Sequence, residues 1–199
     1  MTNGDQSPHN MRPQLLQGSH VGLAVMHAED APIFARWYQD LRFTARLGLP
    51  GEVQTLEMRR QELEQNTRIK PNEICFSIIL CETGAVIGFG GLFDITRALT
   101  ASMFIAIAPE LWGRGYGSEA SRLILEYGFF FKSLHAIKIE VNGFNAAALG
   151  MYERLGFKPA GRVRGALLLN GRRYDQIIMD LLRDELETRH VKEFRSLEH

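Results

Sequence analysis

One stretch of the chain, residues 108–120, limits the possible folds more than any other. It reads Ala-Pro-Glu-Leu-Trp-Gly-Arg-Gly-Tyr-Gly-Ser-Glu-Ala. A β-type run ends here, glycines follow at alternate positions (Gly113, Gly115 and Gly117), and an amphipathic helical pattern begins at once. Glycine has no Cβ, so the backbone N–H groups of such a loop can approach a ligand. The helix start adds unpaired donors and about half a positive charge. The loop predicts a site for an anionic group such as pyrophosphate.

The loop does not identify that ligand, and a glycine-rich turn without any ligand stays open as an alternative. Two nucleotide motifs are excluded by the spacing. The Gly-x-Gly-x-x-Gly pattern of dinucleotide-binding folds is not met, and the Lys-Ser/Thr pair of a Walker loop is missing.

Apolar periodicity around the loop predicts a mixed α+β domain rather than a doubly wound one. The expected strands are 20–26, 74–80, 86–93, 102–108, 136–141, 163–169 and 174–181. The expected helices are 29–41, 117–131 and 146–155, with 53–66 either a solvated helix or a mobile flap. Asn170-Gly171 between the last two strands is a strong hairpin signal.

Composition narrows the class of protein. A chain of 199 residues is long enough for one domain with a core. Acidic and basic residues balance at 23 each, so no overall field favours nucleic acid or an anionic membrane surface. We expect neither a membrane span nor a signal peptide, because residues 1–18 are polar and no apolar run approaches about 20 residues. Cys75 and Cys81 are expected to be reduced thiols in a cytoplasmic protein.

A second constellation follows the first helix after the loop. In the strand 136–141, Ile137, Ile139 and Val141 share one face. The opposite face carries polar residues, namely Lys138, Glu140 and Asn142. A polar face on a central strand suggests that it lines a cleft. Asn145, Ala148 and Tyr152 then fall at i, i+3 and i+7 on one face of the next helix. The alternatives are a helix cap for Asn145, a core aromatic for Tyr152 and a surface charge for Glu140.

Together these two blocks resemble the GNAT superfamily of acyl-CoA-dependent N-acyltransferases. The resemblance is closest to the group of ribosomal-protein N-terminal acetyltransferases and spermidine acetyltransferase. The phosphate loop reads Trp112-Gly-Arg-Gly115-Tyr-Gly117. Trp112 replaces the Gln or Arg of the general motif, as is common in that group. The second family block is complete in residues Asn145, Ala148, Tyr152, Gly156 and Phe157.

The resemblance implies a fold and an activity. The fold is a single domain, residues 19–183 between tails 1–18 and 184–199, with a mostly antiparallel sheet of about seven strands and a central β-α-β unit that binds acyl-CoA. The activity is direct transfer of an acetyl group from acetyl-CoA to an amine, with no metal. The residues expected to bind the cosubstrate are Ile105, Ile107, Trp112, Gly113, Arg114, Gly115, Tyr116, Gly117, Ser118, Asn145 and Ala148.

The resemblance also implies catalytic roles. Glu140 would be the general base, with Glu29, Asp30 and Glu57 as the next candidates. Tyr152 would protonate the leaving thiolate, and a backbone N–H of the strand 102–108 would stabilise the oxyanion.

The acceptor amine stays open between a protein N-terminus and a small molecule. Acidic residues around the first helices could attract a cation, or they form an ordinary solvated face. A homodimer joined through the closing hairpin is compatible with the resemblance. The rival functions are an acyl-CoA sensor without catalysis and an ATP-binding domain.

Overall fold

The computed structural model describes residues 12–52, 54–66 and 70–191. Within these residues the strands form one eight-stranded sheet in the order β1-β2-β3-β4-β5-β6-β8-β7. The strands are β1 (Gln14–Gln17), β2 (Val21–Val25), β3 (Ile74–Leu80), β4 (Val86–Phe93), β5 (Thr100–Ile107), β6 (Ala136–Asn142), β7 (Lys158–Leu169) and β8 (Arg172–Leu182). The helices are α1 (Ala31–Trp37), α2 (Leu41–Arg46), α3 (Leu56–Asn66), α4 (Tyr116–Glu126) and α5 (Ala146–Leu155). The predicted mixed α+β class with a mostly antiparallel sheet is confirmed.

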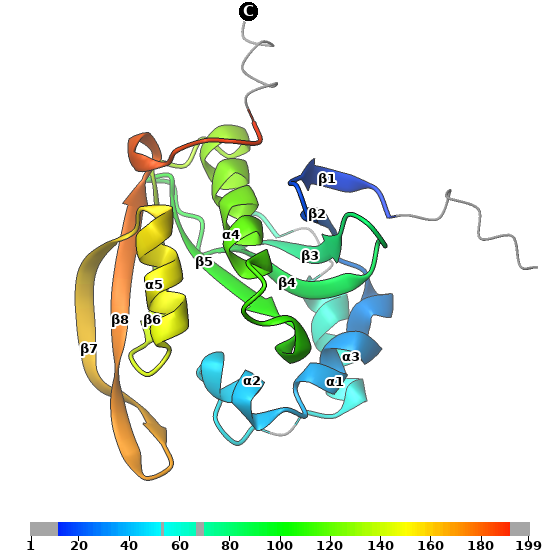
Figure 1. Ribbon diagram of the computed structural model, residues 1–199, viewed down its shortest axis with the longest axis vertical. Helices are drawn as coiled ribbons and strands as arrows, with labels where there is room; N and C mark the ends of the chain where they lie inside the picture. The colour runs from blue at the N-terminus through cyan, green and yellow to red at the C-terminus, as the bar shows by residue number, and fades with distance from the viewer. Residues whose placement is uncertain (1–11, 53, 67–69, 192–199) are drawn as a thin grey trace, which may run out of the picture.

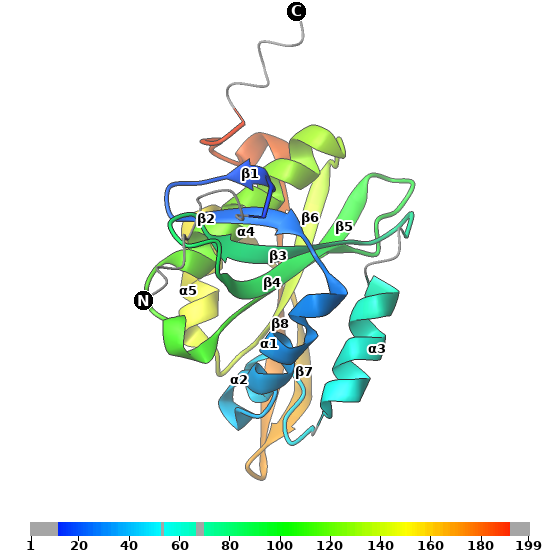
Figure 2. The same cartoon turned by 90° about the vertical axis from the view of Figure 1, so that its right-hand side faces the viewer.

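The helices cover both faces of this sheet (Figure 1). On one face α4 and α5 enclose the main core, in which Leu123, Ile124 and Phe129 are fully buried. On the other face α1, α2 and α3 surround an aromatic cluster that includes Phe34, Trp37 and Phe43. Figure 2 shows α1 and α3 side by side on this second face. None of the helices in the described ranges is long and apolar enough to cross a bilayer.

The expected helix 29–41 is shorter in the structure, and a second helix that was not predicted, α2, follows it. After α1 ends at Trp37, the side chain of Asp40 accepts a hydrogen bond of 2.8 Å from the N–H of Arg42 and caps a new helix, α2. The break turns α2 toward the carboxyl end of β5. The long helix expected at 117–131 also changes character, because Tyr127–Phe131 forms a π-helix after α4.

Both ends of the chain differ from the expected tails. Residues 14–17, expected within the loose segment 1–18, form the edge strand β1. At the other end Leu186 and Val191 are buried in the main core, although 184–199 was expected to be a tail. The fully buried carboxylate of Glu126 accepts the N–H groups of Arg189 and His190. Residues 1–11 and 192–199 lie outside the described residues.

Turn chemistry explains the closing hairpin. Asn170 and Gly171 adopt φ values of 52° and 73°, the left-handed conformation that a two-residue hairpin turn requires. The turn sequence therefore fixes the pairing of β7 with β8. Figure 1 shows this hairpin reaching beyond the neighbouring strands.

Candidate active site

The site begins where β5 and β6 separate. These two strands form the parallel pair of the sheet, and they pair only at Thr100, Ala101 and Ser102 of β5. Beyond these residues the strands diverge, so the backbone of β5 from Met103 to Ile107 has no partner on the β6 side. A cavity of about 570 Å³ occupies the gap. An unpaired strand edge inside a cavity offers backbone donors and acceptors to a ligand.

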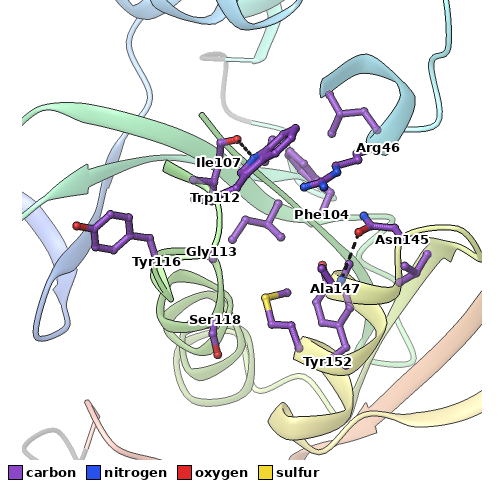
Figure 3. Close-up of a pocket in the computed structure, with 18 of the residues that line it drawn as sticks. Arg46, Phe104, Ile107, Trp112, Gly113, Tyr116, Ser118, Asn145, Ala147 and Tyr152 are labelled. Atoms are coloured by element: carbon purple, nitrogen blue, oxygen red, sulfur yellow. Dashed lines mark hydrogen bonds between the residues drawn. The ribbon is translucent and has the colours of Figure 1, made fainter. Parts of the chain in front are cut away.

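The four sides of this cavity are β5, the loop and first turn of α4, the pair formed by the end of β6 and α5, and the helix α2 (Figure 3). All the residues predicted to bind the cosubstrate lie on its wall except Arg114, which is exposed outside it. Glu140 and Tyr152 also lie on the wall. The structure therefore brings together two blocks that are separated in sequence.

The glycine loop has the geometry of an anion cradle. Gly113 and Gly115 adopt φ values of 79° and 86°, and a Cβ at either position would meet no other atom within 4 Å. The backbone conformation, not crowding, is thus what requires glycine there. Gly115 begins α4, and no side chain in the described ranges caps this helix start. The first amides of α4, at Tyr116 and Gly117, precede any acceptor within the helix and remain available to a ligand.

Trp112 joins the loop to the strand before it. Its indole N–H donates a hydrogen bond of 2.7 Å to the carbonyl oxygen of Ile107 (Figure 3). The guanidinium of Arg46, from α2, stacks on the indole ring at 3.7 Å from its centroid. The polar atom of Trp112 is therefore engaged within the protein, and Trp112 contributes to the cavity through its ring.

The second block forms the opposite wall. Asn145 caps α5, because its Oδ1 accepts a hydrogen bond of 3.3 Å from the N–H of Ala148. This confirms the cap expected for Asn145 and leaves its amide nitrogen for other partners. Tyr152 is 6% exposed, and its ring packs edge-on against Phe157. Burial raises the pKa of Tyr152, so its phenol stays protonated well above neutral pH.

The base candidate lies on β6. Ile137, Ile139 and Val141 are buried in the core beneath α4 and α5. The side chains of a strand alternate between faces, so Glu140 and Asn142 point to the face covered by α2. The Nδ2 of Asn142 lies 3.4 Å from the carbonyl oxygen of Arg46, which agrees with this placement. Glu140 is half exposed and lies 3.6 Å from the ammonium of Lys138.

The alternative bases lie elsewhere. Asp30 is buried among Arg12 and Ser77, whereas Glu29 and Glu57 are exposed. None of these three carboxylates lines the cavity. Among the residues on the cavity wall Glu140 is the single carboxylate. Glu140 and Tyr152 thus approach the gap between β5 and β6 from opposite faces of the sheet.

Several wall residues were not predicted from the sequence. Phe43, Arg46 and Leu47 come from α2, and Arg154 comes from the last turn of α5. Arg154 is on a helix already assigned to the site, but its spacing of two residues from Tyr152 gives no signal, because such positions do not share a helix face. Arg46 has no sequence signal either, because it is one of several arginines in its region and only the fold brings it to the cavity.

Comparisons with known proteins agree with this geometry. Residues 20–158 match the model of the acetyltransferase (GNAT) domain. The chain is 25% identical to an uncharacterised N-acetyltransferase, p20, of Bacillus licheniformis, over 86% of this chain and 98% of that one. It is 27% identical to the spermidine N(1)-acetyltransferase of Escherichia coli, over 57% of this chain and 61% of that protein. Its fold matches the spermidine N-acetyltransferase of Vibrio cholerae, solved with CoA and spermine, with a TM-score of 0.77 at 22% identity over 84% and 98% of the two chains.

Proposed function

This chain belongs to the GNAT acetyltransferase family, and we propose that it moves the acetyl group of acetyl-CoA onto a primary amine in the gap between β5 and β6. The observation that carries this proposal is the placement of Glu140 and Tyr152 on the cavity wall, one on each face of the sheet. An amine that enters beneath α2 meets the carboxylate of Glu140. A thioester that lies along α5 meets the phenol of Tyr152.

The donor half of the cavity supplies complementary groups for CoA. The free amides at the start of α4 would receive the pyrophosphate. Asn145 would hold the pantetheine arm through its amide nitrogen, and the wall residues Ile105 and Ile107 would offer the unpaired backbone of β5. Arg154 is on the wall and Arg114 is not. We therefore assign the side-chain contact to a CoA phosphate to Arg154 in place of Arg114.

The transfer needs two proton movements. An alkyl ammonium has a pKa of about 10.4, so at neutral pH it must lose a proton before it attacks. Glu140 accepts this proton as the amine nitrogen bonds to the thioester carbon. A backbone N–H on the unpaired edge of β5 stabilises the oxyanion that forms. The carbon–sulfur bond then breaks, and Tyr152 gives its proton to the departing sulfur.

The test combines ligand binding with turnover. Acetyl-CoA and CoA should raise the melting temperature, whereas ATP and NAD should not. A ligand at about 100 times its dissociation constant adds roughly 2.7 kcal/mol of stability. A panel of primary amines should then release free thiol from acetyl-CoA. Stabilisation without any amine-dependent release would favour the sensor function. Stabilisation by ATP or NAD alone would contradict the proposal.

We also propose a homodimer that forms through the β7–β8 hairpin. The outer strand β7 exposes Val163 and Leu168, which are 45% and 53% accessible. Light scattering after size-exclusion chromatography should give about twice the chain mass of 22.5 kDa. A mass equal to one chain would contradict the dimer. The free thiols of Cys75 and Cys81 support a cytoplasmic location for the enzyme.

A further inference from the structure

The acceptor end of the cavity is bordered by α2, which contributes the charged side chain of Arg46 to the cavity wall. The guanidinium stacks on Trp112, which belongs to the β5 side of the gap. The carbonyl oxygen of the same residue lies 3.4 Å from Nδ2 of Asn142, on the β6 side. Arg46 therefore bridges the two sides of the gap, and Figure 3 shows it reaching from α2 toward Trp112. Glu140 points to the same face of the sheet as α2, because it alternates with the core residues Ile139 and Val141.

Arg46 is an exposed residue whose guanidinium makes no ion pair with the carboxylates of the described residues. Among the described residues, Arg46 has no carboxylate within 4.0 Å, whereas the neighbouring Arg42 is paired with Asp40 at 2.6 Å. Burial, with the nearby charge of Arg42, lowers the pKa of Arg46, yet an arginine remains charged at neutral pH. Stacking on an indole uses the face of the guanidinium and leaves its in-plane N–H groups free to donate.

Of the acidic residues around the first helices, Asp40 exerts an attraction on Arg46 that is weaker than the opposing effect of burial, and it is itself paired with Arg42. None of Glu29, Asp30, Asp40, Glu52, Glu57, Glu62 and Glu64 lines the cavity. The charged residues on the wall are Arg46, Glu140 and Arg154, and the only acid among them faces Lys138. Arg154 lies at the far end of α5 from Asn145, about 13 Å away at 1.5 Å per residue, so it belongs to the donor half.

From these contacts we propose that Arg46 determines acceptor specificity and that the acceptor is a primary amine that also carries a carboxylate. The amine would lie at Glu140 and the carboxylate would receive the in-plane N–H groups of Arg46, the two-pronged geometry in which arginine binds carboxylates most strongly. A polyamine would instead bring a second positive charge toward the guanidinium of Arg46. This inference rests on the proposed function and refines its acceptor.

The experiment uses two series of acceptors in which only the charge of one group changes. The first is γ-aminobutyrate, γ-aminobutyramide and putrescine. The second is the amides of alanyl-glutamate, alanyl-glutamine and alanyl-lysine, which test a peptide N-terminus. For each, amine-dependent thiol release gives kcat and KM. The wild-type enzyme should favour the anionic member of at least one series over the neutral one by about 10- to 100-fold in kcat/KM, the range for a charge-assisted hydrogen bond.

Variants of Arg46 separate specificity from structure. Arg46→Met should lower kcat/KM for the anionic acceptor by about 10- to 100-fold, mainly through KM. The same substitution should change kcat/KM for the neutral acceptor by less than about threefold. Arg46→Lys should restore part of the preference, and Arg46→Glu should shift it toward the cationic member. Arg42→Met is the matched control, because this arginine is on the same helix but outside the cavity wall. Arg42→Met should leave kcat/KM for the anionic and the neutral acceptor within about threefold of the wild-type values.

Three results would overturn the inference. The first is a wild-type enzyme that acetylates neutral or cationic amines at least as well as anionic ones. The second is an equal loss for every acceptor in Arg46→Met, which would make the residue structural. The third is a weaker affinity of Arg46→Met for acetyl-CoA, which would place the guanidinium in the donor site. In each case the proposed function stands if some amine is acetylated. Absence of acetyl-CoA binding or of any turnover would reject both.

Discussion

The indole N–H of Trp112 and the carbonyl oxygen of Ile107 are joined by a hydrogen bond of 2.7 Å. This bond fixes the start of the glycine loop to the last residue of β5, at the edge left unpaired by the separation from β6. The guanidinium of Arg46 stacks on the same indole ring. Trp112 thus connects the glycine loop, the strand β5 and the helix α2.

Replacing Trp112 should loosen this connection. Trp112→Phe keeps a ring beneath Arg46 but removes the bond to Ile107. A neutral hydrogen bond contributes about 1 kcal/mol, so we expect a similar loss of unfolding free energy and a several-fold weaker affinity for acetyl-CoA. Calorimetric titration measures the affinity, and urea denaturation measures the stability. An unchanged affinity would mean that the bond does not position the loop.

Gly115 tests the anion cradle. Gly115→Ala should cost about 1–2 kcal/mol of stability, because alanine disfavours the left-handed conformation. It should also weaken acetyl-CoA binding. Gly51→Ala is the matched control: Gly51 has φ of 78°, its Cβ would also meet no atom within 4 Å, and it lies outside the cavity. Both variants should lose a similar amount of unfolding free energy, but only Gly115→Ala should bind acetyl-CoA more weakly. Equal acetyl-CoA affinity in both would contradict the cradle.

The proposed role of Tyr152 as the general acid can be tested by removing its hydroxyl group. Tyr152→Phe should lower kcat by about 100-fold or more while acetyl-CoA affinity stays within about twofold. Because burial raises the pKa of Tyr152, its proton is held throughout the usual assay range. The wild-type rate should therefore show no alkaline decline from this group below about pH 10. Tyr127→Phe, outside the cavity wall, is the control. A fully active Tyr152→Phe enzyme at all pH values would remove the role.

Asp30 predicts how stability depends on pH. Burial alone would raise the pKa of Asp30, but hydrogen bonds from Arg12 and Ser77 outweigh it and lower that pKa below 3.8. A depressed carboxyl pKa stabilises the fold above about pH 4, and this contribution is lost as the pH falls through the folded-state pKa. Asp30→Asn should cost about 2–3 kcal/mol at pH 7, and less below pH 4.

Urea denaturation at several pH values measures that difference. The exposed neighbour Glu29 provides the control, since its side chain is 84% accessible. Glu29→Gln should leave the acid dependence unchanged. A constant difference between Asp30→Asn and wild type from pH 7 to pH 3 would contradict the assignment.

The sequence predicted those helices and strands whose ends are set by turn residues or helix caps next to them in the chain. The bounds of β3, β4 and α5 match the predicted runs, because turn residues separate the two strands and the Asn145 cap begins the helix. The edge strand β1 was missed because it is short, half of its residues are polar, and it forms by pairing with β2. The break between α1 and α2 has a local signal in Asp40, which caps the second helix.

The same distinction applies to the site. Glu140 and Tyr152 could be singled out because strand alternation puts Glu140 on the polar face of β6 and helix periodicity groups Tyr152 with Asn145 and Ala148. The position of α2 could not, because it depends on how Phe43 packs with Trp37 beneath the sheet. Arg46 reaches Trp112 only as a result of that packing.

The most direct test of the proposed mechanism is the substitution Glu140→Gln, with acetyl-CoA binding and acetyl transfer measured separately. We expect the affinity for acetyl-CoA to stay within about twofold and kcat to fall by 100-fold or more, because the ammonium then has no base at the gap. Glu153→Gln, on the exposed side of α5, should match the wild type in both. A Glu140→Gln enzyme with undiminished kcat would show that transfer does not use this carboxylate, and it would contradict the mechanism proposed for this site.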